Sequence, residues 1–234
     1  MKKELNKSAR ELYSEGTDYQ FDTPELQLGP WTSYSLIHDP KHMCFVLSRY
    51  KFCAKMLVGK KTVMEIGPGD GFGLPIISQV VGHLYGVDWD SRLLESNARR
   101  LAHLQNVTYI HLDLNEAKPD IEIDAAFSID VIEHLEPAKE ANFMGNIINC
   151  LKPNGVLITG TPNITASQYA TPRSQVQHIN LKSFDTLREL NERYFENVFM
   201  FGMNDEVLHT GYHAMCHYIW SLGVGLRAEW RKDK

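Results

Sequence analysis

An acid and an acid–histidine pair stand close together in the segment SIDVIEHLEP, residues 128–137. If a helical turn begins at Asp130, then Glu133 and His134 follow at i+3 and i+4 and share its face. Two carboxylates and an imidazole in one place can bind a divalent cation or carry out acid–base chemistry. The segment is therefore a candidate catalytic centre, and a structural role for the histidine is the plain alternative.

A second unusual stretch is VMEIGPGDGFG, residues 63–73, in which four glycines fall within seven residues. Glycine lets the backbone turn sharply and approach a ligand closely after a strand. A diphosphate would avoid carboxylates there, yet Glu65 precedes the loop and Asp70 lies within it. Two acids favour a cationic ligand, and S-adenosylmethionine fits because it carries an ammonium and a sulfonium but no phosphate.

Acidic residues also follow the next two predicted strands. Asp88 comes about 20 residues after the glycine loop, where an acid can accept hydrogen bonds from both ribose hydroxyls. That position alone would suit NAD equally well. Trp89 could cover the adenine ring, and Asp113 could accept from the adenine amino group.

The elements that must position these residues alternate between strands and helices. Helices are predicted over 91–104, with Ser91 as its N-cap, and over 138–155, ended by Pro153 and Gly155. This alternation predicts a parallel, doubly wound sheet that binds ligands at the carboxyl ends of its strands. Two later segments without a long helix between them predict a terminal antiparallel pair. The predicted strands are 62–67, 83–88, 107–113, 123–130 and 155–162, then 196–202 and 213–223.

Five pieces of the chain, taken in order, resemble the class I S-adenosylmethionine-dependent methyltransferases: EIGPGDG, GVDWD, HLDLNE, FSIDVIEHL and LKPNGVLITGTPN. They lie within residues 61–163, and five pieces in register are far more specific than one glycine-rich loop. The resemblance implies an α/β enzyme with a doubly wound, seven-stranded, mostly parallel Rossmann-like sheet whose last strand is antiparallel. The implied S-adenosylmethionine-binding residues are Glu65, Gly67, Pro68, Gly69, Gly71, Asp88, Trp89, Asp113, Leu114 and Asp130.

The segment DVIEH resembles the metal-dependent O-methyltransferase branch of that family, which includes small-RNA 2′-O-methyltransferases and ubiquinone-biosynthesis O-methyltransferases. The small-RNA enzymes carry a further histidine shortly before an aromatic residue, and His178 followed by Phe184 has similar spacing. The implied metal ligands are Asp130, Glu133, His134 and His178, whose mixed oxygen and nitrogen atoms suit Mg²⁺ or Mn²⁺. The alternative is a metal-free general base, either His134 or another histidine.

Three histidines at intervals of four occur near the C-terminus, namely His209, His213 and His217. A glycine interrupts the helical spacing, so an apolar strand over 213–223 is favoured over a helical metal site. The preceding loop would then lie beside the methyl donor, which makes His209 a second candidate for the catalytic base. His217 is expected to be a core residue.

Residues 1–60 are predicted as a helical lid over the cofactor site, and residues 61–234 as the methyltransferase domain. Apolar residues at helical spacing predict a helix over 43–57, while Pro, Gly and aromatic residues predict a loop over 21–40. The lid residues that could contact a small polar acceptor, or pack in the core instead, are Trp31, Tyr34, Arg49 and Tyr50.

Composition narrows the class of protein. The 234 residues carry a net charge of −5 with 43% apolar and 23% charged residues, which is ordinary globular composition without a basic footprint for nucleic acid. The four cysteines form no CxxC pair, and the N-terminus has no apolar signal segment. No apolar run is long enough to span a bilayer. These features predict a cytoplasmic protein.

We therefore expect an O-methyltransferase that acts on a small hydroxylated acceptor, such as a sugar, a sugar nucleotide or a similar metabolite. Assembly as a homodimer is left open. The nearest alternative is an N-methyltransferase, because no motif fixes the acceptor atom. The alternatives from other classes are a non-catalytic S-adenosylmethionine-binding subunit, against which Glu65 and Asp88 argue, and a nucleotide-dependent dehydrogenase, against which Glu65 argues.

Overall fold

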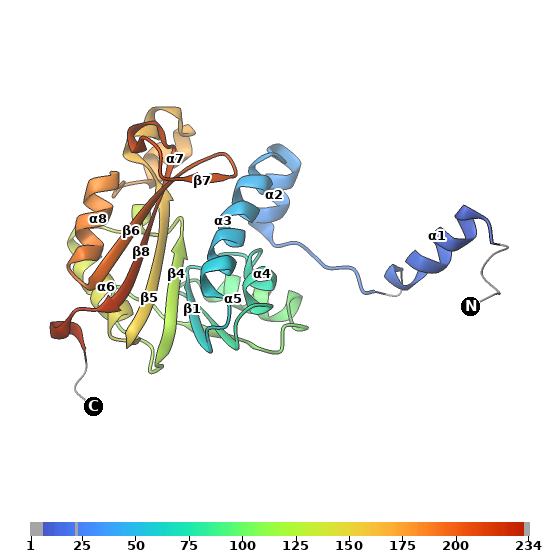
Figure 1. Cartoon of the computed structure of the whole chain (residues 1–234), viewed down its shortest axis with the longest axis horizontal. Coiled ribbons are helices and arrows are strands. Elements are labelled where there is room, and N and C mark those ends of the chain that lie inside the picture. The colour runs from blue at the N-terminus through green and yellow to red at the C-terminus, as the bar shows by residue number, and fades with distance from the viewer. Residues whose placement is uncertain (1–6, 22, 232–234) are drawn as a thin grey trace.

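A computed structural model describes residues 7–21 and 23–231 (Figure 1). Its centre is an eight-stranded sheet with the order β3-β2-β1-β4-β5-β8-β6-β7. The first five strands in this order are parallel, and β8 runs antiparallel to both β5 and β6. The strands are β1 Thr62–Ile66, β2 His83–Asp88, β3 Val107–His111, β4 Ile123–Ile129, β5 Leu151–Pro162, β6 Phe195–Asn204, β7 Val207–His209 and β8 Tyr218–Leu226.

The predicted doubly wound sheet and its terminal antiparallel pair are confirmed, but the sheet has eight strands rather than seven. The additional strand is β7, which covers three residues and pairs with β6 as a hairpin at the edge of the sheet. A strand this short carries too few residues to show an alternating apolar pattern, so the sequence did not indicate it.

Helices cover both faces of the sheet (Figure 1). The α-helices are α1 Ala9–Thr17, α2 Pro30–His38, α3 His42–Leu57, α4 Leu74–Ser78, α5 Ser91–Arg100, α6 Glu140–Ile148, α7 Pro172–Gln177 and α8 Phe184–Glu192. Short 3₁₀ helices cover Asp18–Gln20, Ile132–His134, Pro137–Lys139, Ile164–Tyr169, His213–Met215 and Ala228–Trp230.

The two faces of the sheet belong to separate apolar cores, because successive side chains of a strand point to opposite sides. Met64 and Ile66 of β1 contact the core that contains residues of α6 and α8. Val63 contacts the core that contains residues of α3 and α4. Each strand is therefore held from both sides, which fixes the positions of the residues that follow the strand ends.

Several predicted boundaries were wrong for local reasons. The helix predicted over 91–104 ends at Arg100, and its N-cap is Asp90, whose side chain accepts a hydrogen bond from the Arg92 amide at 3.0 Å. The helix predicted over 138–155 is α6, which ends at Ile148. Pro153 lies in the first part of β5, where the pairing with β4 is irregular, so its missing amide costs no regular ladder bond.

Two further predicted segments also differ from the structure. The loop predicted over 21–40 contains α2, which begins with Pro30, a residue that suits the first position of a helix because it needs no amide donor there. The strand predicted over 213–223 begins only at Tyr218, since a 3₁₀ turn covers His213–Met215.

The helices that precede β1 in the described part of the chain have different surroundings. Helix α1 contains no buried residue and stands apart from the sheet at the end of an extended segment (Figure 1). Helix α3, in contrast, is part of the core, because Cys53 and Leu57 are both 0% exposed and share a cluster with Phe127 of β4. No helix among the described residues has the length and apolarity needed to cross a bilayer.

The Leu57→Ala substitution tests whether α3 belongs to the folded core. Because Leu57 is fully buried, we expect the free energy of unfolding to fall by about 2–5 kcal/mol. The control is Leu12→Ala in α1, where the side chain is 49% exposed and the change should stay within about 0.5 kcal/mol. Urea denaturation followed by tryptophan fluorescence measures both. Equal small losses would show that α3 does not contribute to the core.

Candidate active site

The glycine loop follows β1 at the edge of the sheet where the carboxyl ends of the neighbouring parallel strands β2 and β4 also lie. Gly67, Gly69 and Gly71 have φ angles of 65°, 54° and 75°, in the left-handed region that favours glycine. A Cβ atom on Gly67 would lie only 2.7 Å from the Val131 side chain. The loop therefore needs glycine both for its conformation and for its close packing against the segment after β4.

A cavity of about 280 Å³ lies beside this loop. Its walls come from α2, α3, the glycine loop and the end of β4. Among its lining residues are Trp31, Tyr50, Gly67, Pro68, Gly69 and Asp130. The structure thus brings part of the predicted lid together with the predicted cofactor-binding loop, although Tyr34 is 62% exposed and does not line the cavity.

Glu65 is a buried carboxylate next to this loop, with 1% of its surface exposed. Burial raises its pKa to about 8 and the charge of Asp88 adds to this shift, while a hydrogen bond from Tyr50 opposes it. The Tyr50 hydroxyl donates to Oε1 at 2.7 Å, whereas Oε2 is buried without a hydrogen-bond partner. A cationic donor is what this half-satisfied carboxylate lacks, so it suits the ammonium group predicted from the sequence.

Asp70, the second acid of the loop, has a different role from the one suggested by the sequence. Its two carboxylate oxygens accept hydrogen bonds from the amide and the hydroxyl of Thr32, at 2.7 and 3.0 Å. Trp31 packs against Gly69, where a Cβ atom would lie 2.8 Å from the indole. Asp70 therefore joins α2 to the glycine loop, and it also lines the cavity beside that loop.

The acids after β2 and β3 lie at the same edge of the sheet. Asp88 is 8% exposed, and its carboxylate accepts a hydrogen bond from the Asp90 amide at 3.0 Å. Burial raises its pKa, and amide hydrogen bonds oppose that shift. Asp113 accepts from the amide of Asn115 at 2.8 Å, and the neighbouring Leu114 is buried. Trp89 is 69% exposed, which leaves its ring free to stack on a ligand.

A second group of side chains lies just beyond β4. Glu133, His134 and His178 each offer a ligand atom, and these atoms lie within 4.8 Å of one another. Glu133 and His134 belong to the 3₁₀ turn after β4, and His178 caps the C-terminus of α7. Three of the four predicted metal ligands are therefore brought together from two parts of the chain that are more than 40 residues apart.

The chemistry of this cluster suits a cation. Glu133 is 0% exposed, and burial together with the charge of Asp130 raises its pKa to about 8. The Thr161 hydroxyl donates to Oε2 at 3.0 Å, but Oε1 is buried without a partner. His134 Nδ1 lies 3.1 Å from the carbonyl oxygen of Gln177, so a proton on Nδ1 would leave Nε2 free as a ligand. Burial and the neighbouring His134 lower the pKa of His178, which favours the neutral imidazole that binds metals.

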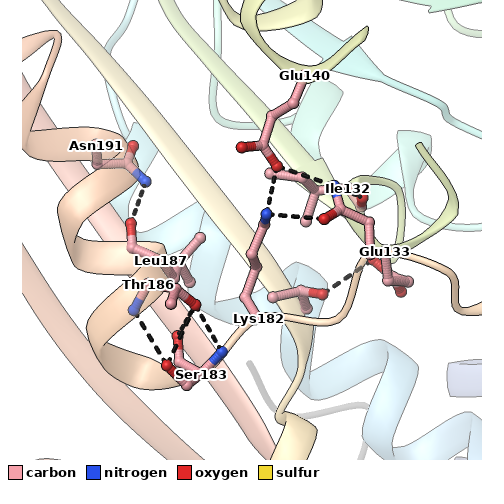
Figure 2. A network of polar contacts seen from close by, with 10 residues as sticks. Ile132, Glu133, Glu140, Lys182, Ser183, Thr186, Leu187 and Asn191 are labelled. Carbon is pink, nitrogen blue, oxygen red and sulfur yellow. Dashed lines mark hydrogen bonds and ion pairs between the residues drawn. The ribbon is translucent and has the colours of Figure 1, made fainter. Parts of the chain in front are cut away.

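A polar network fixes His178 beside the 3₁₀ turn. The Asn180 amide donates to the carbonyl oxygen of Glu133 at 2.9 Å, and its side chain donates to Glu140 at 2.9 Å. Lys182 is ion-paired with Glu140 and donates to the Asn180 side chain at 3.0 Å. Figure 2 shows Lys182 extending to Glu140 beside the turn that carries Glu133. The segment after α7 is thus anchored to the segment after β4.

Asp130 differs from the sequence-based expectation. A helical turn beginning at Asp130 was wrong, because its φ of 56° is left-handed and the 3₁₀ turn begins at Ile132. Its carboxylate accepts from Arg49 Nη1 at 2.6 Å and does not join the cluster of Glu133 and the two histidines. Positive φ at a non-glycine residue is uncommon and is often found at functional sites.

The histidines near the C-terminus lie in other surroundings. His209 Nε2 is 2.8 Å from the Asn204 side chain, and its Nδ1 accepts from the Gly211 amide at 3.0 Å. Both ring nitrogens of His209 thus have partners in β6 and in the turn after β7, which does not favour the role of catalytic base. His217 is half-buried rather than fully buried, and its ring lies 6.3 Å from that of Phe45.

The residues that hold the side chains of both sites in place were not predicted from the sequence. Thr161 at the end of β5, Asn180, Lys182 and Glu140 make the contacts that hold the cluster. Asn97 of α5 is fully buried and donates to the Gly69 carbonyl at 2.8 Å. The sequence contained no signal for them, because polar residues are also common in exposed helices and loops and their types do not identify a partner.

Comparisons with known proteins agree with this architecture. The model of a methyltransferase domain family matches residues 38–198. A probable S-adenosylmethionine-dependent methyltransferase from Mycolicibacterium smegmatis is 33% identical over 104 residues, 44% of this chain and 38% of that protein. A ubiquinone biosynthesis O-methyltransferase from Rickettsia akari is 26% identical over 145 residues, 58% of this chain and 55% of that protein. The matches thus span less than two thirds of either relative.

A solved structure shows the same fold. The methyltransferase domain of the bacterial protein CtHen1-C superposes with a TM-score of 0.64 at 18% identity, over 77% of this chain and 99% of that chain. The glycine loop, the acids at the strand ends and the sheet order define a class I S-adenosylmethionine-dependent methyltransferase fold. Since the family model covers more than half of the sequence, the chain belongs to the methyltransferase domain family.

The Glu65→Gln substitution should change how stability depends on pH in the absence of cofactor. The pKa of Glu65 is about 8 in the folded state against 4.5 for an ordinary glutamate. Between these values the folded protein keeps a proton that the unfolded chain releases, so its contribution to stability falls as pH rises. Wild type should therefore lose stability relative to Glu65→Gln from about pH 4.5 to about pH 8.

Urea denaturation across this pH range measures the difference between the two proteins. The control is Glu95→Gln, which changes an exposed carboxyl on α5 and should alter the free energy of unfolding by no more than about 0.5 kcal/mol. A stability difference for Glu65→Gln that does not vary with pH would contradict a buried carboxyl with a raised pKa.

Proposed function

We propose that this chain transfers the methyl group of S-adenosylmethionine to an oxygen atom of a small hydroxylated acceptor, with help from a divalent cation. The single observation that carries the proposal is the cluster of Glu133, His134 and His178 directly after β4. It lies a few residues along the chain from Asp130, which lines the cavity beside the glycine loop. A cation site and a methyl-donor site would thus adjoin.

The cofactor side of the site uses residues with complementary chemistry. S-adenosylmethionine supplies an electrophilic methyl group next to its sulfonium. The ammonium would supply the hydrogen bond that the buried Oε2 of Glu65 lacks, and the glycine loop allows close approach of the backbone to the cofactor. Asp88 would accept from the ribose hydroxyls, Asp113 and Leu114 would contact the adenine, and Trp89 would cover the ring.

The metal side uses one carboxylate and two imidazoles. Such a mixed set suits Mn²⁺ better than Mg²⁺, because Mg²⁺ prefers oxygen ligands and imidazole suits the transition metals. A bound divalent cation lowers the pKa of a hydroxyl group that it coordinates and orients it. Thr161 holds the Glu133 carboxylate, and the Gln177 carbonyl fixes the orientation of the His134 ring. Because these contacts hold the ligand side chains in place, a cation bound to them would position the acceptor oxygen for transfer.

The overall charge of the chain favours a small acceptor over a nucleic acid. The net charge of −5 gives no general attraction for the phosphates of nucleic acid. The name of the Rickettsia relative assigns O-methylation to that protein, which supports oxygen as the acceptor atom here. Assembly as a homodimer and a cytoplasmic location stay predictions from the sequence.

A metal-free mechanism with His134 as general base is the second candidate. The observation in its favour is that His134 Nδ1 can donate to the Gln177 carbonyl, which would leave Nε2 as a proton acceptor. It differs from the main proposal because it leaves Glu133 Oε1 buried and unsatisfied. Metal binding would satisfy this oxygen, so we favour the metal-assisted mechanism.

Calorimetric titration of Mn²⁺ and Mg²⁺ into protein saturated with S-adenosylhomocysteine tests the proposal. We expect stoichiometric Mn²⁺ binding, weakened by about 30-fold or more in His134→Ala and His178→Ala because each removes a ligand. The control is His103→Ala, an exposed histidine on the turn after α5, which should bind like wild type. Absence of Mn²⁺ binding by wild type would exclude the metal-assisted mechanism and favour the metal-free base.

A further inference from the structure

Arg49 on α3 has an unusual environment for an arginine. It is only 7% exposed, and its Nη1 donates to the Asp130 carboxylate at 2.6 Å. Its guanidinium lies over the ring of Tyr218 at 3.9 Å from the ring centre. Planar stacking on an aromatic ring and a charge-assisted hydrogen bond hold the group in one orientation. Arg49 thus connects its own helix, α3, to the end of β4 and to the start of β8.

Two independent features keep Asp130 away from the cluster of Glu133, His134 and His178. Its left-handed backbone, with φ of 56°, prevents it from sharing a helical face with Glu133 and His134. Its carboxylate is bonded to Arg49 and lines the cavity beside the glycine loop. Among the described residues, only Glu133, His134 and His178 form a set of ligand atoms within 4.8 Å of one another.

The ion pair between Arg49 and Asp130 explains why Asp130 stays where it is. Arg49 Nη1 and Asp130 Oδ2 carry opposite charges and lie 2.6 Å apart. If Asp130 left Arg49 to bind a metal, it would strand a guanidinium that is 7% exposed. Removing one partner from a buried ion pair is strongly destabilising, because the remaining charge cannot be solvated.

We propose that Arg49 is a positioning residue that keeps Asp130 on the cofactor side, so that the metal is held by Glu133, His134 and His178 alone. This inference rests on the proposed function, and it replaces the four-ligand set implied by the sequence with a three-ligand set. Asp130 then lines the cavity that would receive the methionine end of the cofactor. Three protein ligands also leave more coordination positions for water and acceptor oxygens than four would.

The Asp130→Asn substitution separates the two sets of ligands. Asparagine keeps the size of the side chain and an oxygen that can accept from Arg49, but it removes the charge. If Asp130 is not a ligand, Mn²⁺ affinity in protein saturated with S-adenosylhomocysteine should change by less than about threefold. The matched variant is Glu133→Gln, which should lose about 30-fold or more because it removes a ligand.

The affinity for S-adenosylhomocysteine should respond to the same two substitutions in the opposite way. Without metal, Asp130→Asn should weaken S-adenosylhomocysteine binding by about fivefold or more, and Glu133→Gln should leave it within about twofold. Arg49→Lys keeps a positive charge but loses the planar fork, so it should also weaken S-adenosylhomocysteine while leaving Mn²⁺ affinity unchanged. A purely structural role for Arg49 would instead weaken both ligands together and lower the melting temperature.

Water-proton relaxation of Mn²⁺-loaded wild type tests the ligand count without any substitution. Three protein ligands predict about three exchangeable waters on an octahedral ion, and four predict about two. Two waters, or a loss of Mn²⁺ binding in Asp130→Asn when wild type binds, would overturn the three-ligand set and leave the proposed function intact. Failure of wild type to bind Mn²⁺ at all would overturn both.

Discussion

Two buried carboxylates that are each only half satisfied govern the site, and the rest of the structure is arranged around them. Glu65 receives one hydrogen bond from Tyr50, Glu133 receives one from Thr161, and each keeps a second oxygen buried without a partner. Burial raises both pKa values to about 8. Such groups are costly unless a cation completes them. Glu65 lies in β1, and Glu133 lies in the turn that follows the adjacent strand β4. Under the proposed function, Glu65 would receive the ammonium group of the cofactor and Glu133 would bind the divalent cation.

Helix α3 connects these two positions. Its consecutive residues Arg49 and Tyr50 reach Asp130 and Glu65, respectively. The same helix contributes Cys53 and Leu57 to the apolar core, so the polar contacts rest on rigid packing. Helix α3, which lies in the segment that the sequence suggested to be a lid, is thus packed in the core beneath the site. Helix α2 borders the cavity and is joined to the glycine loop by the hydrogen bonds between Thr32 and Asp70.

The segment after α7 depends on a different kind of contact. His178 reaches the cluster because Asn180 and Lys182 bind to Glu140 and to the turn after β4. These contacts are polar and largely buried, so they are specific in direction as well as in distance. They join two segments that no regular secondary structure connects. The cluster of Glu133, His134 and His178 is consequently formed by loops that a polar network holds together, whereas the cavity is formed by two helices, the glycine loop and the end of β4.

Sequence alone predicted the parallel sheet, the glycine loop after the first strand, the acids at the strand ends and the neighbouring positions of Glu133 and His134, because these depend on local periodicity and short spacing. Tertiary structure decided the remaining features. Asp130 could not be assigned from spacing, since its left-handed backbone and its bond to Arg49 arise only when α3 packs against the sheet. The bonding of Asp70 to Thr32 and the approach of His178 to Glu133 likewise require segments far apart in the chain to meet. Short-range patterns carry no information about such long-range contacts, which form only when the two cores assemble.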